Sequence, residues 1–461
     1  MQENHQHTAG SADRLEFYGG GVGALAPLLA FVVGATYLGF AGAPDERGLW
    51  TVLLLALGLA LLLCRNRERC AEAMVAGMSQ PLVLLMILAW LFAGVFGALL
   101  SASGLVQALA ASAQAVGLQG GLFCAAAFLV ACLFSTATGT SLGTMILCFP
   151  LLYPAGAGSG ASPFWLAGAI IAGSTFGDNI SPVSDTTIAS ATTQAVGLGD
   201  VVASRLRYAL PAAAVALVGF VALGGGAPVA AAQATAGEMA PLLMLAAPAF
   251  VLGLLLRRTH LVVALAAGIG AALVLALATG LLSWSQVVYI DPAAYGARGL
   301  LVDGLERGVG VSIFTILLMG IVAVVEASQV VDRFSSGETA ATVPSGERQI
   351  FGAITVSCLL TTHSSVAILA VGNAARRIGE RVGIPATRRA NILDTAVCTY
   401  PFLLPWFIPT ILASNLTVTD GAMPRLTALQ IGLANLHSWL LLAILCAAVF
   451  LGYGRQQQSD A

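Results

Sequence analysis

The sequence predicts an all-α polytopic membrane protein, built as an inverted repeat of two five-span units that each contain a re-entrant hairpin and a broken helix. Of its 461 residues, 58% are hydrophobic and only 9% are charged, whereas soluble proteins carry about 25% charged residues. Uncharged runs of about 20 residues recur along the chain, and a water-soluble core could not hide them all. An acid-bearing stretch interrupted by proline occurs twice, which suggests the repeat.

Twelve apolar segments account for the two units. Residues 1–17 are polar and are expected to form a disordered cytoplasmic tail, and residues 455–461 form a second tail. The first unit, residues 18–225, has apolar segments at 21–41, 48–64, 80–101, 118–152, 164–198 and 205–224. The second unit, residues 226–454, has them at 239–256, 260–282, 305–326, 349–375, 391–415 and 427–452.

Basic residues indicate how these segments are oriented. All 20 are arginines; they form no polybasic arm, which argues against nucleic acid as a partner. Most of the arginines form four clusters, at 65–69, 205–207, 257–258 and 376–389. All four clusters fall in the cytoplasm if segments 118–152 and 349–375 each enter and leave the membrane on the same side. Their tips, residues 135–141 and 361–365, are small and polar, as a buried turn must be. Each unit then makes five crossings, so the second is inverted, as in many secondary transporters.

The broken helix of the first unit, 164–198, carries the strongest functional signal. Asp178 and Asp185 lie seven residues apart in an otherwise uncharged run. Pro182 has no N–H and disfavours helical geometry at the residue before it, so the helix should break there. The polar side chains around this break are Asn179, Ser181, Ser184, Thr186 and Thr187. Oxygen ligands around a broken helix at membrane depth suit a small cation.

The second unit repeats this pattern in its broken helix, 391–415. Asp394 and Thr395 are followed by Pro401, Pro405 and Pro409, each of which removes a backbone hydrogen bond. An aspartate inside the bilayer costs roughly 3 kcal/mol on insertion scales, so all three aspartates are candidate cation or proton sites. Two structural alternatives stay open: Asp185 could cap the second half-helix, and Asp394 could pair with the nearby arginines at 388 and 389.

The two hairpin tips supply further candidates for binding substrate or protons. They are Thr138, Thr140 and Ser141 in the first hairpin and Thr362, His363 and Ser364 in the second. His363 could titrate between about pH 5 and 8, or it could be a satisfied structural group. The eight cysteines lie mostly in apolar runs, so we expect small buried thiols and neither disulfides nor metal ligands.

Residues 176–187, FGDNISPVSDTT, closely resemble the signature of the NhaC-type Na⁺/H⁺ antiporter family, within the ion-transporter superfamily. The resemblance implies Na⁺ at Asp178, Asp185 and Asp394, no cofactor beyond the transported Na⁺ and H⁺, a bacterial inner-membrane location and a homodimer. The arginine clusters, with both hairpins re-entrant, predict that both termini are cytoplasmic. Residues 390–406 are similar to a second family stretch, SRTLEDxxTxxxPLxPWN. This chain departs from it at Leu393 and Phe407, where the family has Glu and Asn, and His363 stands where the family often has Asp.

The sequence therefore predicts a secondary transporter in which Na⁺ and H⁺ compete for buried aspartates during alternating access. Its partners would be membrane lipid, a small cation and, in the alternative that the departures favour, a small organic acid or amino acid exchanged by coupling to H⁺ or Na⁺. An intramembrane aspartyl protease is a remote alternative, because Thr175 stands where a GxGD-type protease has its first glycine. A channel is a further alternative, although two interrupted helices suit a carrier better. The sequence contains no phosphate-binding GxxxxGK[ST] loop, so we do not expect the chain to hydrolyse ATP.

Overall fold

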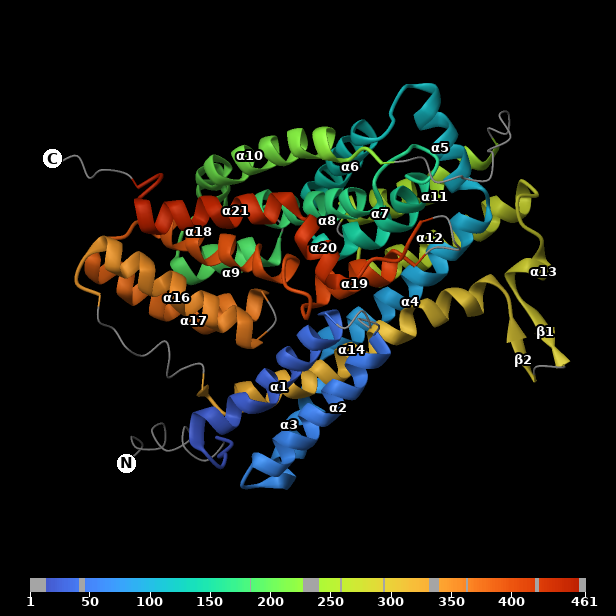
Figure 1. Cartoon of the computed structure of the whole chain (residues 1–461). Helices are drawn as coiled ribbons and strands as arrows, with labels where there is room; N and C mark the ends of the chain where they lie inside the picture. Colours follow the sequence, from blue (N-terminus) through green and yellow to red (C-terminus); the bar gives the residue numbers. More distant parts are fainter. Residues whose placement is uncertain are drawn as a thin grey trace, which may run out of the picture.

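The computed structural model describes residues 14–40, 46–182, 184–226, 240–257, 259–292, 295–330, 340–361, 364–418 and 423–455. The described chain is almost entirely helical, and its helices form two groups that lie side by side (Figure 1). The all-α class predicted from composition is therefore confirmed.

The first group is a slanting bundle that contains the N-terminal helices (Figure 1). It consists of α1 (Gly20–Phe40), α2 (Glu46–Leu63), α3 (Arg67–Met78), α4 (Pro81–Ala102) and α14 (Leu300–Ala327), with α12 (Leu261–Ala278) against α4. The long helix α14 packs along α2, α3 and α4. A Cβ added at Gly94 would lie 2.1 Å from the carbonyl oxygen of Gly304, so glycine is what lets α4 and α14 approach this closely.

The second group holds both predicted hairpins and both predicted broken helices. From the first half of the chain it contains α5 (Leu105–Ala115), α6 (Gly121–Thr138), α7 (Ser141–Ala155), α8 (Pro163–Ile180), α9 (Asp185–Gln194) and α10 (Leu198–Leu223). From the second half it contains α16 (Val343–Thr361), α17 (Ser364–Val382), α18 (Ala386–Val397), η3 (Tyr400–Phe402), α19 (Ile408–Leu416), α20 (Ala428–Ala434), α21 (Leu436–Cys446) and η4 (Ala447–Leu451).

Short elements link the two groups. The 3-10 turn η1 (Ala240–Leu245) leads into α11 (Ala246–Leu256), which packs against α12. At the far end of α12, α13 (Trp284–Val287) precedes an antiparallel hairpin of β1 (Tyr289–Asp291) and β2 (Gly296–Arg298), in which Tyr289 pairs with Arg298. This hairpin lies at the end of the molecule opposite the N-terminus (Figure 1).

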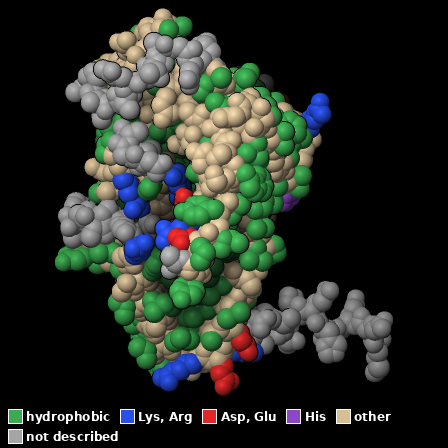
Figure 2. Space-filling model, turned by 90° about the vertical axis from the view of Figure 1, so that its right-hand side faces the viewer, with side chains coloured by type: hydrophobic (Ala, Val, Ile, Leu, Met, Phe, Trp, Pro, Cys, Tyr) green, Lys and Arg blue, Asp and Glu red, His purple; other side chains and the backbone are tan. Residues whose placement is uncertain are grey.

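The helix lengths and compositions fit a multi-pass membrane protein. Within the described residues, six helices are long and apolar enough to cross a bilayer: α1, α4, α6, α10, α12 and α14. A seventh span is possible from α20 with α21 and η4, which bend by 61° at their junction. Figure 2 shows the face on the right-hand side of Figure 1; hydrophobic and uncharged surface covers most of it, and Arg, Asp and Glu side chains occur in small groups. The candidate spanning helices themselves expose large hydrophobic side chains, such as Leu29 of α1 and Val218 of α10, which suit contact with lipid.

Several predicted boundaries are wrong in detail. The segment predicted at 427–452 is not one straight span, because Asn435 separates α20 from α21; its side chain accepts from Ser438 N at 3.1 Å and donates to the Phe402 carbonyl at 3.2 Å. Helices α3 and α5 and the β-hairpin were not predicted. The segment predicted at 205–224 begins earlier, at Leu198, so that Arg205 lies within α10 and not in a cytoplasmic loop.

Each predicted hairpin contains a pair of helices, and a tight turn joins the first pair. The first turns at Gly139, whose φ of +68° favours glycine, and Thr140, whose hydroxyl caps α7 by accepting from Gly143 N at 3.3 Å. Helices α16 and α17 form the second hairpin, and Thr362 and His363 at its tip lie outside the described residues. The inverted relation of the two units remains a prediction.

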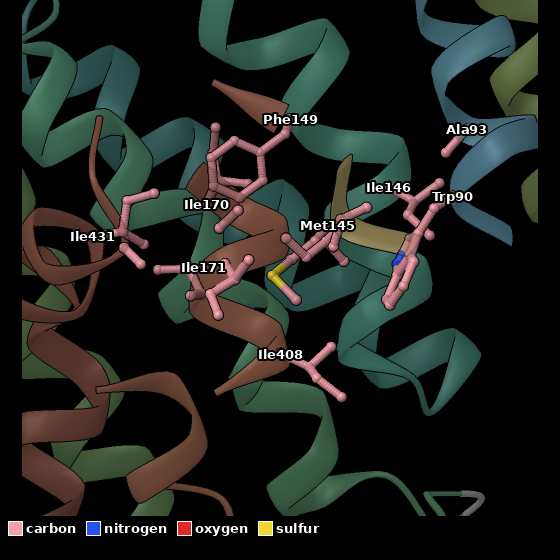
Figure 3. Close-up of a cluster of buried hydrophobic side chains, with 14 of the residues drawn as sticks. Trp90, Ala93, Met145, Ile146, Phe149, Ile170, Ile171, Ile408 and Ile431 are labelled. Atoms are coloured by element: carbon pink, nitrogen blue, oxygen red, sulfur yellow. The ribbon is translucent and has the colours of Figure 1, made fainter. Parts of the chain in front are cut away.

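A hydrophobic core packs α7 of the first hairpin against α8 of the first broken helix. Figure 3 shows Met145, Ile146 and Phe149 of α7 packed with Ile170 and Ile171 of α8. Trp90 of α4, Ile408 of α19 and Ile431 of α20 join the same cluster (Figure 3). Apolar burial on this scale, at about 25 cal/mol per Å², holds the hairpin against the broken helix. All eight cysteines are free, as predicted, and seven of them are buried.

Candidate functional site

The predicted break in the first broken helix is present. Helix α8 ends at Ile180, and α9 begins at Asp185 with Ser184 as its N-cap residue. Ser181 is extended, with φ −76° and ψ 126°, because Pro182 follows it. Asp178, in the last turn of α8, is only 7% exposed, and its Oδ1 accepts a hydrogen bond from Ser141 N at 3.1 Å. The first hairpin tip therefore donates a backbone N–H directly to this carboxylate.

A central cavity of about 380 Å³ is lined by seven of the predicted site residues. Asp178, Asp185 and Thr186 line it from the break between α8 and α9. The first hairpin tip contributes Thr138, Gly139, Thr140 and Ser141, and the second contributes Ser364. Its remaining lining is Leu85, Met86, Ala89, Trp90, Leu142, Ile146, Leu261, Pro401, Phe402, Ile408 and Pro409. The aspartate segment and both hairpin tips thus meet at one place, between the two helix groups.

Asp185 is the first residue of α9, and Ser184, which makes no side-chain cap bond, occupies the N-cap position. The Oδ1 of Asp185 accepts from Thr186 N at 3.0 Å, so this carboxylate satisfies a free N–H at the start of α9, as the capping alternative expected, although from the position after the cap. The side chain of Asp185 is exposed toward the cavity, and its Oδ2 accepts from Ser365 Oγ at 2.5 Å. This bond joins the first broken helix to the start of α17, and Ser365 was not among the predicted site residues.

Arg205 is the functional candidate that sequence reasoning missed. Its Nη1 lies 2.7 Å from Oδ2 of Asp394, and both side chains are completely buried. The same nitrogen donates to the carbonyl of Asn179 at 2.8 Å and to the hydroxyl of Thr187 at 2.9 Å. Since a guanidinium stays protonated in proteins, α10 supplies a permanent positive charge here.

The predicted alternative for Asp394, an ion pair with Arg388 or Arg389, is wrong. Arg388 pairs instead with the buried carboxylate of Glu347 at 2.9 Å, and Arg389 donates to the Gln194 side chain at 2.9 Å. These two arginines face away from Asp394 because they lie at the start of α18, more than one turn before it.

The neutral side-chain oxygens of the predicted site lie around the break between α8 and α9. Thr187 Oγ1 donates to the carbonyl of Asp178 at 3.2 Å, and the hydroxyls of Ser184 and Thr186 are 3.1 Å apart. Ser181 is fully buried. Within the described part of the chain, four buried side-chain oxygens have no hydrogen-bond partner: Asn179 Oδ1, Asp394 Oδ1 and Thr395 Oγ1, which belong to the predicted site, and Ser438 Oγ, which does not. Unpartnered buried oxygens are expected where a cation or water binds.

The substituted positions of the second half fit their apolar residues. Leu393 and Phe407 are both completely buried in one hydrophobic cluster around α16–α18. Apolar side chains therefore fit both positions. The side-chain oxygens that α18 offers for binding a cation belong to Asp394 and Thr395. Among the described residues, no group of three His, Cys, Asp or Glu side chains could hold a metal ion.

Taken together, the fold and the site define a multi-pass helical membrane protein with buried charges between a broken helix and two hairpin tips. Residues 21–225 match the model of the Na⁺/H⁺ antiporter family, which confirms the resemblance noted in residues 176–187. The chain is also similar to the malate-2H⁺/Na⁺-lactate antiporter of Bacillus subtilis (strain 168), with 29% identity over 203 residues. That match covers 43% of this chain and 41% of the relative, so the chain spans less than half of the relative's length. Both matches are to antiporters and not to enzymes, which supports a secondary transporter and speaks against the protease alternative.

Proposed function

We propose that this protein is a Na⁺/H⁺ antiporter that works by alternating access, with the two ions competing for Asp178 and Asp185. The observation that carries the proposal is the central cavity, where both carboxylates meet both hairpin tips. The family match over residues 21–225 supports the same ions.

Competition follows from the cost of moving a charge through lipid. An ionised carboxylate in a low-dielectric site is costly unless a cation or a proton neutralises it. Asp178 accepts a backbone N–H from Ser141, and Asp185 accepts a backbone N–H from Thr186 and a hydroxyl from Ser365. None of these neutral donors removes the negative charge. The occupied forms therefore cross between the two faces and the empty, charged form does not, which produces obligatory exchange.

The two helix groups supply the moving parts. Trp90 of α4 and Leu261 of α12 line the cavity from the first group, and the hairpin tips and broken helix line it from the second. A shift of one group against the other would open the cavity to opposite faces in turn. We also propose a bacterial inner-membrane location with cytoplasmic termini. Two contacts support the cytoplasmic N-terminus: Leu15 N donates to Ala327 O at 3.0 Å, and Glu16 pairs with Arg65 at 3.2 Å. The N-terminal segment therefore lies beside the arginine-rich turn before α3, and arginine-rich loops favour the cytoplasmic side.

Asp178→Asn tests the proposal in proteoliposomes. Asparagine keeps the shape of the side chain and removes the exchangeable charge, so Na⁺-driven proton movement should be lost while the melting temperature in detergent is kept. Asp200→Asn is the matched control, because Asp200 is exposed in the first turn of α10. Full exchange by the Asp178 variant would refute the assignment.

A second candidate is exchange of a small organic acid coupled to Na⁺ or H⁺. Two observations favour it: the cavity, at about 380 Å³, is far larger than one Na⁺ needs, and the Bacillus relative is named as a malate and lactate antiporter. The N-terminal N–H groups of α9 could hold a carboxylate beside Thr186. Vesicles preloaded with malate or lactate and challenged with the labelled acid would show counterflow under this candidate, and none under simple ion exchange.

A further inference from the structure

The contacts of Arg205 constrain which aspartates can exchange ions. Nη1 of Arg205 bonds Asp394, the Asn179 carbonyl and the Thr187 hydroxyl, so three oxygens already surround one cationic nitrogen. The rest of the guanidinium is fixed as well. Nε donates to Asn391 Oδ1 at 3.3 Å, and Nη2 donates to Ser190 Oγ at 3.4 Å.

This arrangement resembles an occupied cation site. A backbone carbonyl at the end of α8, a hydroxyl in the first turn of α9 and a carboxylate on α18 are the oxygen types that would bind Na⁺. Here a protein cation held by α10 fills the position. The guanidinium cannot leave or lose its proton, so one of the three intramembrane carboxylates is permanently balanced.

We propose that Arg205 is the fixed counter-ion of Asp394, so that the exchangeable negative charge belongs to Asp178 and Asp185 alone. The inference rests on the proposed ion exchange and specifies its charge count. Asp394 is then a positioning residue: it neutralises Arg205, and the pair holds both halves of the interrupted helix against α18.

The free oxygen of Asp394 does not change this conclusion. Its Oδ1 has no hydrogen-bond partner among the described residues, yet a second cation placed there would lie beside the guanidinium on the same carboxylate. Two unit charges about 5 Å apart at an effective dielectric constant of 20 repel enough to lower affinity on the order of 100-fold. Asp178 and Asp185 line the cavity and have no arginine partner in the described structure, so they are the stronger sites for a mobile ion.

The test uses the full chain in proteoliposomes, with Na⁺-driven proton movement followed by a pH-sensitive dye. The variants are Asp394→Asn, Arg205→Gln, their combination, and Arg205→Lys. Arg207→Gln is the matched control, since it removes an exposed arginine two residues further along α10. The Na⁺ KM and the maximal rate are measured for each.

We expect Asp394→Asn to raise the Na⁺ KM at least about tenfold. It leaves an unpaired guanidinium on the Asn179 carbonyl and on the Thr187 hydroxyl, which itself bonds the Asp178 carbonyl. The double variant removes both charges and should return the KM to within about threefold of the wild type. Arg205→Lys keeps the positive charge and should therefore change the Na⁺ KM less than Arg205→Gln does. Arg207→Gln should match the wild type.

A double variant as impaired as Asp394→Asn would overturn the inference, because Asp394 would then itself bind the ion. If the wild type moves no protons in response to Na⁺, the proposed function fails, and the pairing is judged by melting temperature in detergent. Each single variant should then melt lower than the wild type and the double variant should recover. Absence of that recovery would overturn the counter-ion assignment independently of transport.

Discussion

Gly177 lies where α6 packs tightly against α8, and it offers a sharp test of how the hairpin is held on the broken helix. A Cβ added at this glycine would lie 2.1 Å from the carbonyl carbon of Ser135 and 2.3 Å from its oxygen. Both are backbone atoms, so no side-chain rotation can relieve the contact. The hydroxyl of Ser135 also bridges the helices, since it accepts from Gly177 N at 3.0 Å and donates to the Gly173 carbonyl at 2.7 Å.

Gly177→Ala should therefore push α6 away from α8 and destabilise the protein. Overpacking a tight contact costs about 1–3 kcal/mol, and a weakened Ser135 bridge adds about 0.5–1.5 kcal/mol. The higher helix propensity of alanine offsets about 1 kcal/mol of this. The net loss is thus roughly 0.5–3.5 kcal/mol, measured as a lower melting temperature in detergent.

The same substitution should reduce ion exchange, because it moves the first hairpin tip. Ser141 N lies 3.1 Å from Oδ1 of Asp178, and a shift of 1 Å would break that bond. Gly270→Ala is the control: Gly270 is in the middle of α12, and an added Cβ there meets no atom within 4 Å. The control should be neutral or slightly stabilising.

A Gly177→Ala protein with wild-type melting temperature and wild-type exchange would refute the close packing of α6 on α8. Damage of equal size in Gly270→Ala would show that alanine is harmful for reasons unrelated to this contact.

Two further substitutions test contacts away from the cavity. Glu347→Gln removes the fully buried carboxylate that pairs with Arg388 at 2.9 Å and with Arg455 at 2.6 Å, and losing this charge should cost about 3–5 kcal/mol, seen as a lower melting temperature. Glu380→Gln, in an exposed pair, should melt like the wild type, and equal melting of both variants would contradict the prediction. Asn435→Ala removes the cap of α21 and should cost about 1–2 kcal/mol by the same measurement, whereas no change would show that the bend does not depend on this amide.

The break between α8 and α9 could be predicted from the sequence because its cause is local. Proline lacks an N–H and restricts the residue before it, so Pro182 ends a helix whatever surrounds it. The clustering of Asp178 and Asp185 with oxygen-bearing side chains was equally visible, since all of them lie within a dozen residues. The hairpin tips were recognised as polar interruptions of apolar runs, for the same local reason.

The bend at Asn435 and the helices α3 and α5 were missed because hydropathy does not report them. Asn435 lies in an apolar run whose average hides a single amide, and the bend depends on its hydrogen bond to Phe402, which is distant in sequence. Helix α3 is too polar to be recognised as a span, yet α14 is long enough to pack along both α3 and α4.

The sequence by itself determined the membrane class, the broken helix and the two aspartates of the central cavity, because composition, proline and charge act locally or through simple averages. Only the tertiary structure decided the partners: Arg205 with Asp394, Glu347 with Arg388, and Ser365 with Asp185. For an arginine near the start of an apolar segment, a count of charges cannot distinguish a side chain that faces water from one that faces a buried carboxylate. Its burial against Asp394, 189 residues later, exists only once α10 and α18 pack together, since a buried charge requires a partner that the fold brings to it.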